Sequence, residues 1–345
     1  MWLSGPAFLF GLIVRMRQWC YRRGWCASSR LPCRVVSVGN VTVGGTGKTP
    51  VVILLTEWLL AAGRRVAVLS RGYKRESGVP YCLVSDGVRL LAGPSDAGDE
   101  PFLIARRCPT AIVAVGADRA ALGRWVLAHH PVDCMILDDG FQHLALSRDV
   151  DLVLLDATDA LGLDAMVPAG RLREPLSGLG RAAALLVTRA DLKKDVEAVC
   201  SRLRAKHLRA DKVVEVRFVP VSLVSVQSGE TKPLEWCRGM KVWMVSGIGN
   251  SESFCRSIAS LAVEIVGETA FSDHHRYHDD EVRRVHADAQ TAGAELVLTT
   301  EKDAGKLQPF LTPDDSWWAL RIRAEIIHGE ERLRGLVMDP GVGSA

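Results

Sequence analysis

The chain has 345 residues, 48% of them hydrophobic and 24% charged, a composition that excludes long disorder and suits one large domain with a smaller companion. Its formal net charge of +3 gives no sign of a nucleic-acid-binding protein, which would gather Lys and Arg on one face, so no nucleic-acid partner is expected. The nine cysteines form no C-x-x-C pair, which argues against a disulfide framework or a zinc ribbon and favours reduced thiols.

Residues 1–14 are mostly apolar, and arginines and aromatic residues follow them, among them Arg15, Arg17 and Trp19. Such a stretch is too short to span a bilayer, which needs about 20 apolar residues. Arginines next to aromatic side chains suit a helix that lies in the headgroup layer of a membrane. We therefore predict a membrane-associating helix over residues 1–28, with an N-terminal core helix as the alternative.

From Arg34 onwards, short β-branched runs alternate with longer helical stretches, which is typical of a parallel sheet covered by helices on both faces. Buried strands are predicted at 35–38, 66–69, 111–115, 134–137, 152–155 and 184–187, and a helix at 50–62. In open α/β sheets, ligands bind outside the carboxyl ends of the strands. The polar residues that follow these runs are therefore the candidates for chemistry.

A glycine-rich segment lies between the first predicted strand and the first predicted helix, which is the context of a Walker A phosphate-binding loop, or P-loop. Its nucleotide-binding residues are predicted to be Thr42, Val43, Gly44, Gly45, Thr46, Gly47, Lys48 and Thr49. Backbone N–H groups and the positive end of the following helix attract phosphate. Lys48 is expected on the β- and γ-phosphates, and the Thr49 hydroxyl on Mg²⁺. Thr42 departs from the consensus glycine, and a glycine-rich turn without nucleotide is the alternative.

Two pairs of acidic residues are candidates for the same cleft. The apolar run at 134–137 ends in Asp138 and Asp139, the form of a Walker B element that holds Mg²⁺ opposite the phosphate loop. Asp99 and Glu100 lie in a loop before another predicted helix. Four converging acids would repel one another unless a divalent cation and basic groups accompany them. For both pairs, capping of the next helix is the alternative.

After residue 212 the pattern changes to a long alternating β run at 213–226, followed by a polar loop at 228–233 that is interpreted as a linker. A second unit then follows, with strands predicted at 241–246, 295–299 and 317–327 and a helix at 252–262. The predicted organisation is a P-loop nucleotide-binding domain at 29–225, a smaller α/β lobe at 226–328 joined through a β-strand linker, and a tail at 329–345.

Several blocks, in this order, resemble those of the tetraacyldisaccharide 4'-kinase family. Besides the phosphate loop they are Arg71-Gly72-Tyr73, Gly98-Asp99-Glu100-Pro101, Asp138-Asp139-Gly140-Phe141-Gln142-His143, Pro168-Ala169-Gly170-Arg171-Leu172-Arg173-Glu174-Pro175 and Phe271-Ser272-Asp273-His274-His275. The resemblance covers roughly residues 1–305. It implies two α/β/α lobes, ATP and Mg²⁺ in the cleft between them, and phosphorylation of the 4' hydroxyl of the lipid A disaccharide 1-phosphate. It also implies a location at the cytoplasmic face of the bacterial inner membrane, and we expect a monomer.

The resemblance implies roles for individual residues. Thr49, Glu100 and Asp139 would surround Mg²⁺, and Lys48 with Arg171 would neutralise charge on the transferring phosphate. Asp99 is the candidate base, and the family pairs this acid with the histidine that is His274 here. The catalytic set is therefore Asp99, His274, Lys48, Arg171 and Asp139.

Other interpretations of the same residues stay open. The run from Leu185 to Asp191 resembles the guanine-reading [NT]-K-x-D loop of a regulatory P-loop GTPase, with Arg189 in place of Lys. His274 and His278 lie one helical turn apart and could instead belong to a metal site. The 299–303 block matches the family without an evident role, and a cap at the strand end is its alternative. Arg64, Arg65, Lys74 and Arg75 are expected either to grip an anionic lipid or to form a solvated basic surface.

Overall fold

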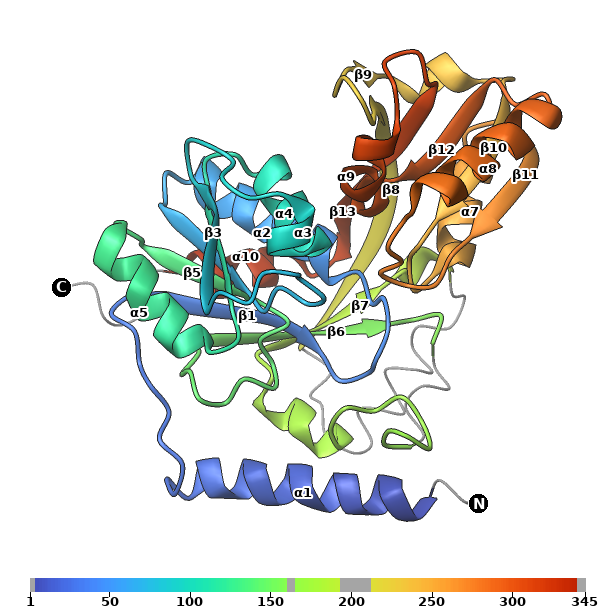
Figure 1. Ribbon diagram of the computed structural model, residues 1–345. Helices are drawn as coiled ribbons and strands as arrows, with labels where there is room; N and C mark the ends of the chain where they lie inside the picture. The colour runs from blue at the N-terminus through green and yellow to red at the C-terminus, as the bar shows by residue number, and fades with distance from the viewer. Residues whose placement is uncertain (1–3, 160–164, 193–211, 340–345) are drawn as a thin grey trace.

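The computed structural model describes residues 4–159, 165–192 and 212–339. Within these ranges the strands form one 13-stranded sheet in the order β11-β10-β12-β13-β8-β7-β6-β1-β5-β2-β4-β3, and β9 pairs with β8 (Figure 1). The strands are β1 (Arg34–Asn40), β2 (Val66–Ser70), β3 (Tyr81–Asp86), β4 (Ile112–Gly116), β5 (Cys134–Asp138), β6 (Val150–Asp156), β7 (Ala184–Thr188), β8 (Val213–Ser225), β9 (Thr231–Lys232), β10 (Lys241–Ser246), β11 (Glu264–Ala270), β12 (Leu296–Thr300) and β13 (Trp317–His328). The helices are α1 (Ser4–Arg22), α2 (Lys48–Ala61), α3 (Pro94–Ala97), α4 (Asp99–Arg107), α5 (Arg119–His129), α7 (Ser251–Ala259), α8 (Asp279–Thr291), α9 (Glu301–Leu307) and α10 (Glu330–Met338).

The first half of the sheet contains parallel strands that are buried along most of their length. β1, β2, β4, β5, β6 and β7 pair in parallel, and β3 adds an antiparallel edge. Such apolar runs form parallel strands because helices cover both faces. In β1, Val36 packs in the core that contains α2, whereas its neighbour Val35 packs in the core that contains α5. The predicted parallel sheet with helices on both faces is confirmed.

Two long strands join this half to the second half. β8 pairs in parallel with β7 through Val213 to Val216, and then runs antiparallel to β13 up to Ser225. β13 in turn begins in parallel with β12 through Trp317 to Leu320. The alternating run predicted at 213–226 therefore forms β8, and the ribbon of β8 and β13 carries the chain between the two halves (Figure 1).

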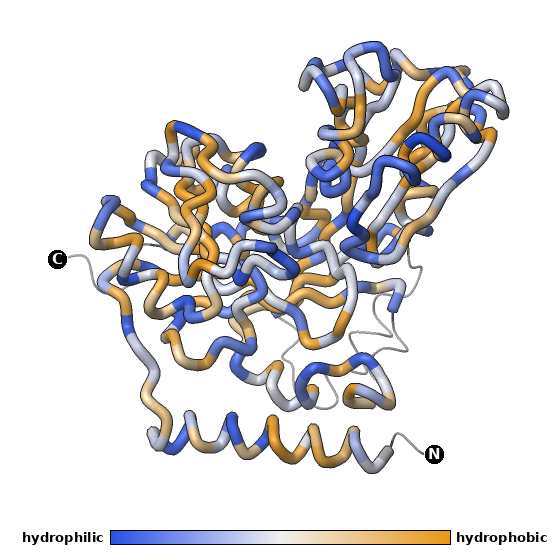
Figure 2. The backbone as a smooth tube through the Cα atoms, in the orientation of Figure 1, coloured by the Kyte–Doolittle hydropathy of each residue, from blue (hydrophilic) through white to orange (hydrophobic). Residues whose placement is uncertain are grey.

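The second half is a smaller α/β unit with helices on both faces of β10, β11 and β12. Met244 of β10 packs with Phe254 of α7, and Val245, its neighbour, packs with Val282 of α8. Figure 2 shows hydrophobic residues concentrated along the strands of both halves. Strands β3 and β11 are not among those predicted from the sequence, and the polar loop expected at 228–233 contains the short strand β9.

Part of the segment predicted to be a tail forms the helix α10. Its Leu333 and Val337, four residues apart, are both fully buried in the core that contains α2. The Arg334 guanidinium also lies 3.9 Å from the centre of the Trp58 ring. Two buried positions in a nine-residue helix are a weak sequence signal, which is why the pattern was not recognised.

The N-terminal helix α1 lies along the outside of the first half (Figure 1). Ala7 is buried, and a Cβ atom at Gly11 would lie 3.6 Å from the Met166 side chain, so this side of the helix faces the protein. On the other side, Phe8 is 74% exposed and Met16 is 59% exposed. None of the described helices combines the length and the apolar character needed to cross a bilayer.

Candidate active site

The glycine-rich segment forms a tight loop between β1 and α2. Gly44 and Gly47 have φ angles of 115° and 82°, a left-handed backbone conformation that favours glycine. A Cβ atom at Gly47 would also lie 2.2 Å from the Phe218 ring, so a larger residue there would have to displace this ring. Inside the loop, the Asn40 side chain donates to the Thr46 hydroxyl at 3.2 Å. The loop therefore presents the first backbone N–H groups of α2 to the cleft, as phosphate binding requires.

Arg171 contacts this loop from its outer side. Its guanidinium donates to the Val43 carbonyl at 2.9 Å and pairs with Asp159 at 2.9 Å, and nearly half of the side chain is exposed. The Val43 N–H in turn donates to the Arg171 carbonyl at 2.8 Å. Arg171 thus braces the phosphate loop, while its charge lies at the opening of a smaller cavity formed with Asp156 and Glu252.

The aspartate pair lies at the carboxyl end of β5, opposite the loop. Lys48 Nζ is 3.5 Å from Asp139 Oδ1, and Arg173 pairs with the same carboxylate at 2.8 Å. Burial would raise the pKa of Asp139, but the charges of Lys48 and Arg173 outweigh it and lower the pKa. Asp139 is therefore ionised, and its carboxylate can accept hydrogen bonds from cationic groups.

Asp138 differs from its neighbour because no cationic side chain of the described residues pairs directly with it, although the Lys48 charge acts on it from nearby. Ser70 donates to Asp138 Oδ2 at 2.9 Å, whereas Asp138 Oδ1 is buried without a hydrogen-bond partner in the described part of the chain. Burial, with the nearby charges of Glu100 and Asp139, raises the pKa of Asp138 to about 7. An unpartnered oxygen at the end of a strand that faces a phosphate loop fits a bound Mg²⁺ or a water of its coordination shell.

The described part of the chain contains no cluster of three or more His, Cys, Asp or Glu side chains arranged as a ready-made metal site. The alternative metal site at His274 and His278 therefore gains no support. Mg²⁺ differs from transition metals because it usually takes one or two carboxylates, several waters and the substrate phosphates. Thr49, Glu100 and Asp139 line one cavity together, so the predicted ligands fit that mode of binding.

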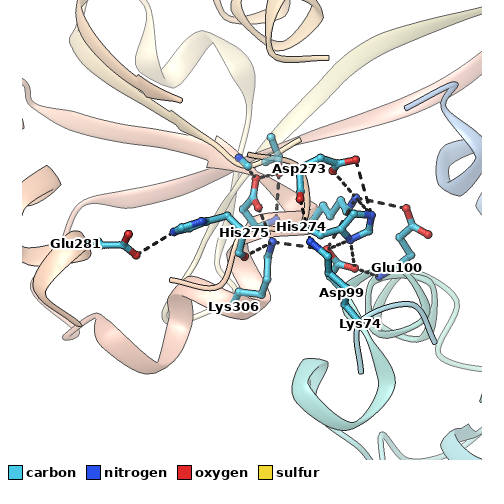
Figure 3. A network of polar contacts seen from close by, with 12 residues as sticks. Lys74, Asp99, Glu100, Asp273, His274, His275, Glu281 and Lys306 are labelled. Carbon is cyan, nitrogen blue, oxygen red and sulfur yellow. Dashed lines mark hydrogen bonds and ion pairs between the residues drawn. The ribbon is translucent and has the colours of Figure 1, made fainter. Parts of the chain in front are cut away.

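Asp99 and His274 come from opposite halves of the protein and meet across the cleft (Figure 3). Asp99 begins α4, and His274 lies in the loop after β11, with its Nδ1 atom 3.0 Å from Asp99 Oδ2. His274 adopts a φ of 58°, which turns its ring toward α4. Burial would raise the pKa of Asp99, but the hydrogen bond from His274 and the charge of Lys302 lower it to about 2. The pair predicted from the resemblance is thus assembled, with Asp99 ionised.

A lysine that was not assigned a role completes this network. Lys302 Nζ lies 3.2 Å from His274 Nε2, 3.2 Å from Asp273 Oδ1 and 3.4 Å from Glu100 Oε1. Within the same block, the Thr300 hydroxyl accepts from the Asp303 N–H and caps α9, so the interpretation of this block as a strand-end cap is confirmed for Thr300. A lysine at the start of a helix gives no sequence signal for a contact with a histidine 28 residues away.

A cavity of about 1060 Å³ connects these groups. Its lining includes the phosphate loop, Asp138, Glu100, His274 and Lys302, and it extends to Phe10 and Ile13 of α1. Asp99 is 8% exposed and lies behind His274. The cavity therefore runs from the loop, past the pair of Asp99 and His274, to the apolar N-terminal helix.

Basic residues line the cavity between the loop and α1. Arg119, at the start of α5, is 6% exposed, and burial, with the nearby charge of Arg71, lowers its pKa. Burial and the charge of Arg119 lower the pKa of His143 to about 4, so this imidazole is neutral at pH 7. Arg119 was not singled out in the sequence, although it follows the carboxyl end of β4, where ligands of open sheets bind.

Arg189, which stands in place of the lysine of the guanine-reading loop, contacts the phosphate loop. Its guanidinium pairs with Asp156, donates to the Gly45 carbonyl at 3.2 Å and lies 5.4 Å from the Phe218 ring centre. The side chain is 10% exposed. The Arg189 side chain is therefore engaged with the phosphate loop and its surroundings, although it occupies the position of the lysine in the guanine-reading loop.

Comparisons with known proteins identify the family. The family model of tetraacyldisaccharide-1-P 4'-kinase, LpxK, matches residues 1–339. A tetraacyldisaccharide 4'-kinase of Anaeromyxobacter sp. (strain Fw109-5) is 43% identical over 316 residues, which cover 91% of this chain and 84% of that protein. That of Geobacter sulfurreducens is 38% identical over 311 residues, covering 90% and 84%. A crystal structure of LpxK from Aquifex aeolicus in complex with ATP matches with a TM-score of 0.79 and 31% identity, covering 97% of this chain and 96% of that one. The chain belongs to the tetraacyldisaccharide 4'-kinase family.

Proposed function

We propose that this protein transfers the γ-phosphate of ATP to the 4' hydroxyl of a tetraacyldisaccharide 1-phosphate, the precursor of lipid A. The observation that carries the proposal is the continuous cavity that joins the phosphate loop to His274 and to α1. A phosphate donor at one end and a lipid acceptor at the other would meet at the acidic and basic residues between them. The family membership and the ATP complex of the Aquifex aeolicus relative support the same assignment.

On the donor side, the loop at 42–49 binds the phosphates through its N–H groups, and Lys48 contributes positive charge. Asp139 holds Lys48 at 3.5 Å, which places the ammonium at the opening of the loop. Thr49, Glu100 and Asp139, with Asp138 beside them, would hold Mg²⁺. When bound, the metal neutralises charge on the phosphate oxygens, which is its usual contribution to phosphoryl transfer. Arg171 adds charge from the outer side of the loop and keeps the loop in place.

On the acceptor side, the Asp99–His274 pair receives the proton that leaves the attacking hydroxyl. The new bond forms between the hydroxyl oxygen and the γ-phosphorus, the bond to the β-phosphate oxygen breaks, and ADP leaves. Phosphoryl transfer depends mainly on alignment and charge neutralisation, so the base contributes less than the phosphate-binding groups. The hydrogen bond of 3.0 Å keeps His274 oriented at the cavity wall.

On the lipid side, α1 offers an apolar surface to the membrane. Phe8, Leu12 and Met16 are spaced four residues apart, so they lie on one side of the helix, and each is more than half exposed. Phe10 and Ile13 line the cavity, so acyl chains anchored in the bilayer could pass directly from α1 to the reacting sugar. We propose that the protein is a monomer that binds the cytoplasmic face of the inner membrane through residues 1–28. The proposed lobes are 29–225 and 226–328, and the segment at 329–345 that follows them contributes α10 to the core of the first lobe.

The experiment that tests this function uses the purified full chain, γ-³²P-labelled ATP, MgCl₂ and a tetraacyldisaccharide 1-phosphate in mixed micelles. We expect label in the lipid fraction, dependent on all three components. Slow GTP hydrolysis without a labelled lipid would instead support the regulatory GTPase and contradict the proposal.

A further inference from the structure

Lys302 reaches four groups at the junction of the two halves of the protein. Its ammonium lies 3.2 Å from His274 Nε2 and 3.2 Å from Asp273 Oδ1, and it is 3.4 Å from Glu100 Oε1 and 3.9 Å from Asp99 Oδ2. The side chain is 17% exposed. A surface lysine without a structural role would be solvated and would not contact an imidazole nitrogen.

The contact with His274 constrains the proton on the imidazole. An ammonium group can only donate, so His274 Nε2 must accept from Lys302 and carries no proton. In a neutral ring, the proton is then on Nδ1, which faces Asp99 Oδ2 at 3.0 Å and donates to that carboxylate. The three side chains form one directed chain of hydrogen bonds from Lys302 through His274 to Asp99. The opposite tautomer would place the Nδ1 lone pair against the carboxylate.

The backbone beneath Lys302 is held in place from both sides. The Thr300 hydroxyl accepts from the Asp303 N–H, and the fully buried Asp303 accepts from the Gly247 N–H at 2.9 Å. Lys306, one turn further along α9, pairs with Asp303 at 2.9 Å. These contacts fix the start of α9 against Gly247 in the loop after β10, and the Gly247 carbonyl in turn accepts from the His274 N–H at 3.2 Å. The position of the Lys302 ammonium relative to His274 is therefore defined by the fold.

We propose that Lys302 is a positioning residue for phosphoryl transfer, which holds the Nδ1-protonated tautomer of His274 in contact with Asp99. The proposal rests on the proposed function, because it assigns Lys302 a role in that reaction. Lys302 acts through His274. Residues that orient metal-bound histidines are worth about 10- to 100-fold in affinity or activity, and we expect a loss of the same order here.

Kinetics of the full chain test the proposal. We expect Lys302→Met to lower kcat about 10- to 100-fold, with KM for ATP changed less than about threefold. Lys302→Arg retains a donor and should recover part of the loss. In the His274→Ala background, Lys302→Met should lower kcat further by less than about twofold, because the effects of residues that act as a unit are not additive. Lys232→Met is the matched control: Lys232 pairs with Glu230 on the surface of the same half, and its loss should leave kcat unchanged.

The tautomer can also be observed without any substitution at Lys302. In wild-type protein labelled with ¹⁵N-histidine at pH 8, the His274 resonances, identified by their loss in His274→Gln, should report a protonated Nδ1 and an unprotonated Nε2. A protonated Nε2 would overturn the proposal. So would a wild-type kcat for Lys302→Met, or a kcat reduction in the double variant equal to the product of the reductions in the two single variants. Because the spectrum does not depend on lipid transfer, failure of the proposed function, seen as a wild-type chain without activity, is distinguishable from failure of this inference.

Discussion

Asp99 and His274 are separated by 175 residues in the sequence, yet their side chains lie 3.0 Å apart and join the two halves of the protein. Burial would raise the pKa of the Asp99 carboxyl, but the His274 hydrogen bond and the Lys302 charge lower it to about 2. The carboxylate is thus ionised throughout the physiological range. Its contribution to stability is present above the usual pKa of an aspartate, 3.8, and is lost as the pH falls toward 2.

Asp99→Asn should therefore lower kcat for lipid phosphorylation by about 10²-fold or more, because an amide cannot stabilise the proton that the Asp99–His274 pair receives from the hydroxyl. The dissociation constant for Mg²⁺-ATP should change little, since Asp99 lies behind His274. Isothermal titration with a non-hydrolysable ATP analogue measures this constant. Asp96→Asn, an exposed change on the preceding helix, is the control and should leave both quantities unchanged. A large loss of nucleotide affinity in Asp99→Asn would refute its assignment as the base.

Lys48→Met should lower kcat by about 10²- to 10³-fold at saturating ATP, because it removes charge that stabilises the transferring phosphate. His274→Ala should lower kcat by no more than this, since base assistance is secondary in phosphoryl transfer. Initial rates of the two variants at the same lipid concentration provide the comparison. A His274→Ala enzyme clearly slower than Lys48→Met would mean that proton removal, rather than charge neutralisation, limits the reaction.

The phosphate loop was predictable residue by residue, because Gly44, Gly47 and Lys48 have fixed spacing within one strand–loop–helix unit. The main strands were predictable for a similar reason, since their apolar runs are continuous. The contact between Asp99 and His274 depends on how two separate halves pack, and only the family resemblance linked these residues. Lys302 and α10 could not be predicted because a lysine in the first turn of a helix, or two apolar positions, are ordinary features of any sequence, and only the tertiary structure gives them partners.

The raised pKa of Asp138, about 7, predicts a pH dependence for magnesium binding. Protons and Mg²⁺ compete for the same buried carboxylate, so the affinity for Mg²⁺-ATP should weaken as pH falls from 8 to 6, by at most about tenfold per pH unit below 7. Titrations across this range test the expectation, with Asp138→Asn as the variant that should lose the dependence. A wild-type affinity that is constant over the range would contradict the role of Asp138.

The same group makes a separate prediction for stability without metal. The pKa of Asp138 is higher in the folded chain than the usual 3.8, so its stabilising contribution is present below that value and is lost as the pH rises toward 7. Above pH 7, the buried carboxylate is ionised, and its Oδ1 atom has no hydrogen-bond partner among the described residues. Asp138→Asn should therefore raise the Tm at pH 8 and change it little at pH 4, as measured by thermal unfolding in EDTA. A lower Tm at pH 8 would show that the carboxylate is stabilised by other groups.

The exposed side of α1 predicts membrane binding. Replacing Phe8, Leu12 and Met16 together with serine should move the protein from the vesicle pellet to the supernatant, because it removes much of the apolar area available for insertion. The control replaces Val88, Leu90 and Leu91, which are also exposed but lie between β3 and α3, and it should leave sedimentation unchanged. Deletion of residues 1–25 should have the same effect as the α1 triple change. Equal sedimentation of wild type and triple variant would mean that α1 does not bind the membrane.

The most direct measurement is the position of the new phosphate on the acceptor. Lipid produced by the purified chain from ATP, Mg²⁺ and tetraacyldisaccharide 1-phosphate can be examined by correlated ³¹P and ¹H NMR. We predict a phosphate monoester coupled to the 4' proton of the distal sugar, absent when Lys48→Met replaces the wild type. A product phosphorylated at any other hydroxyl, or an unmodified lipid recovered from folded and nucleotide-bound protein, would contradict the account.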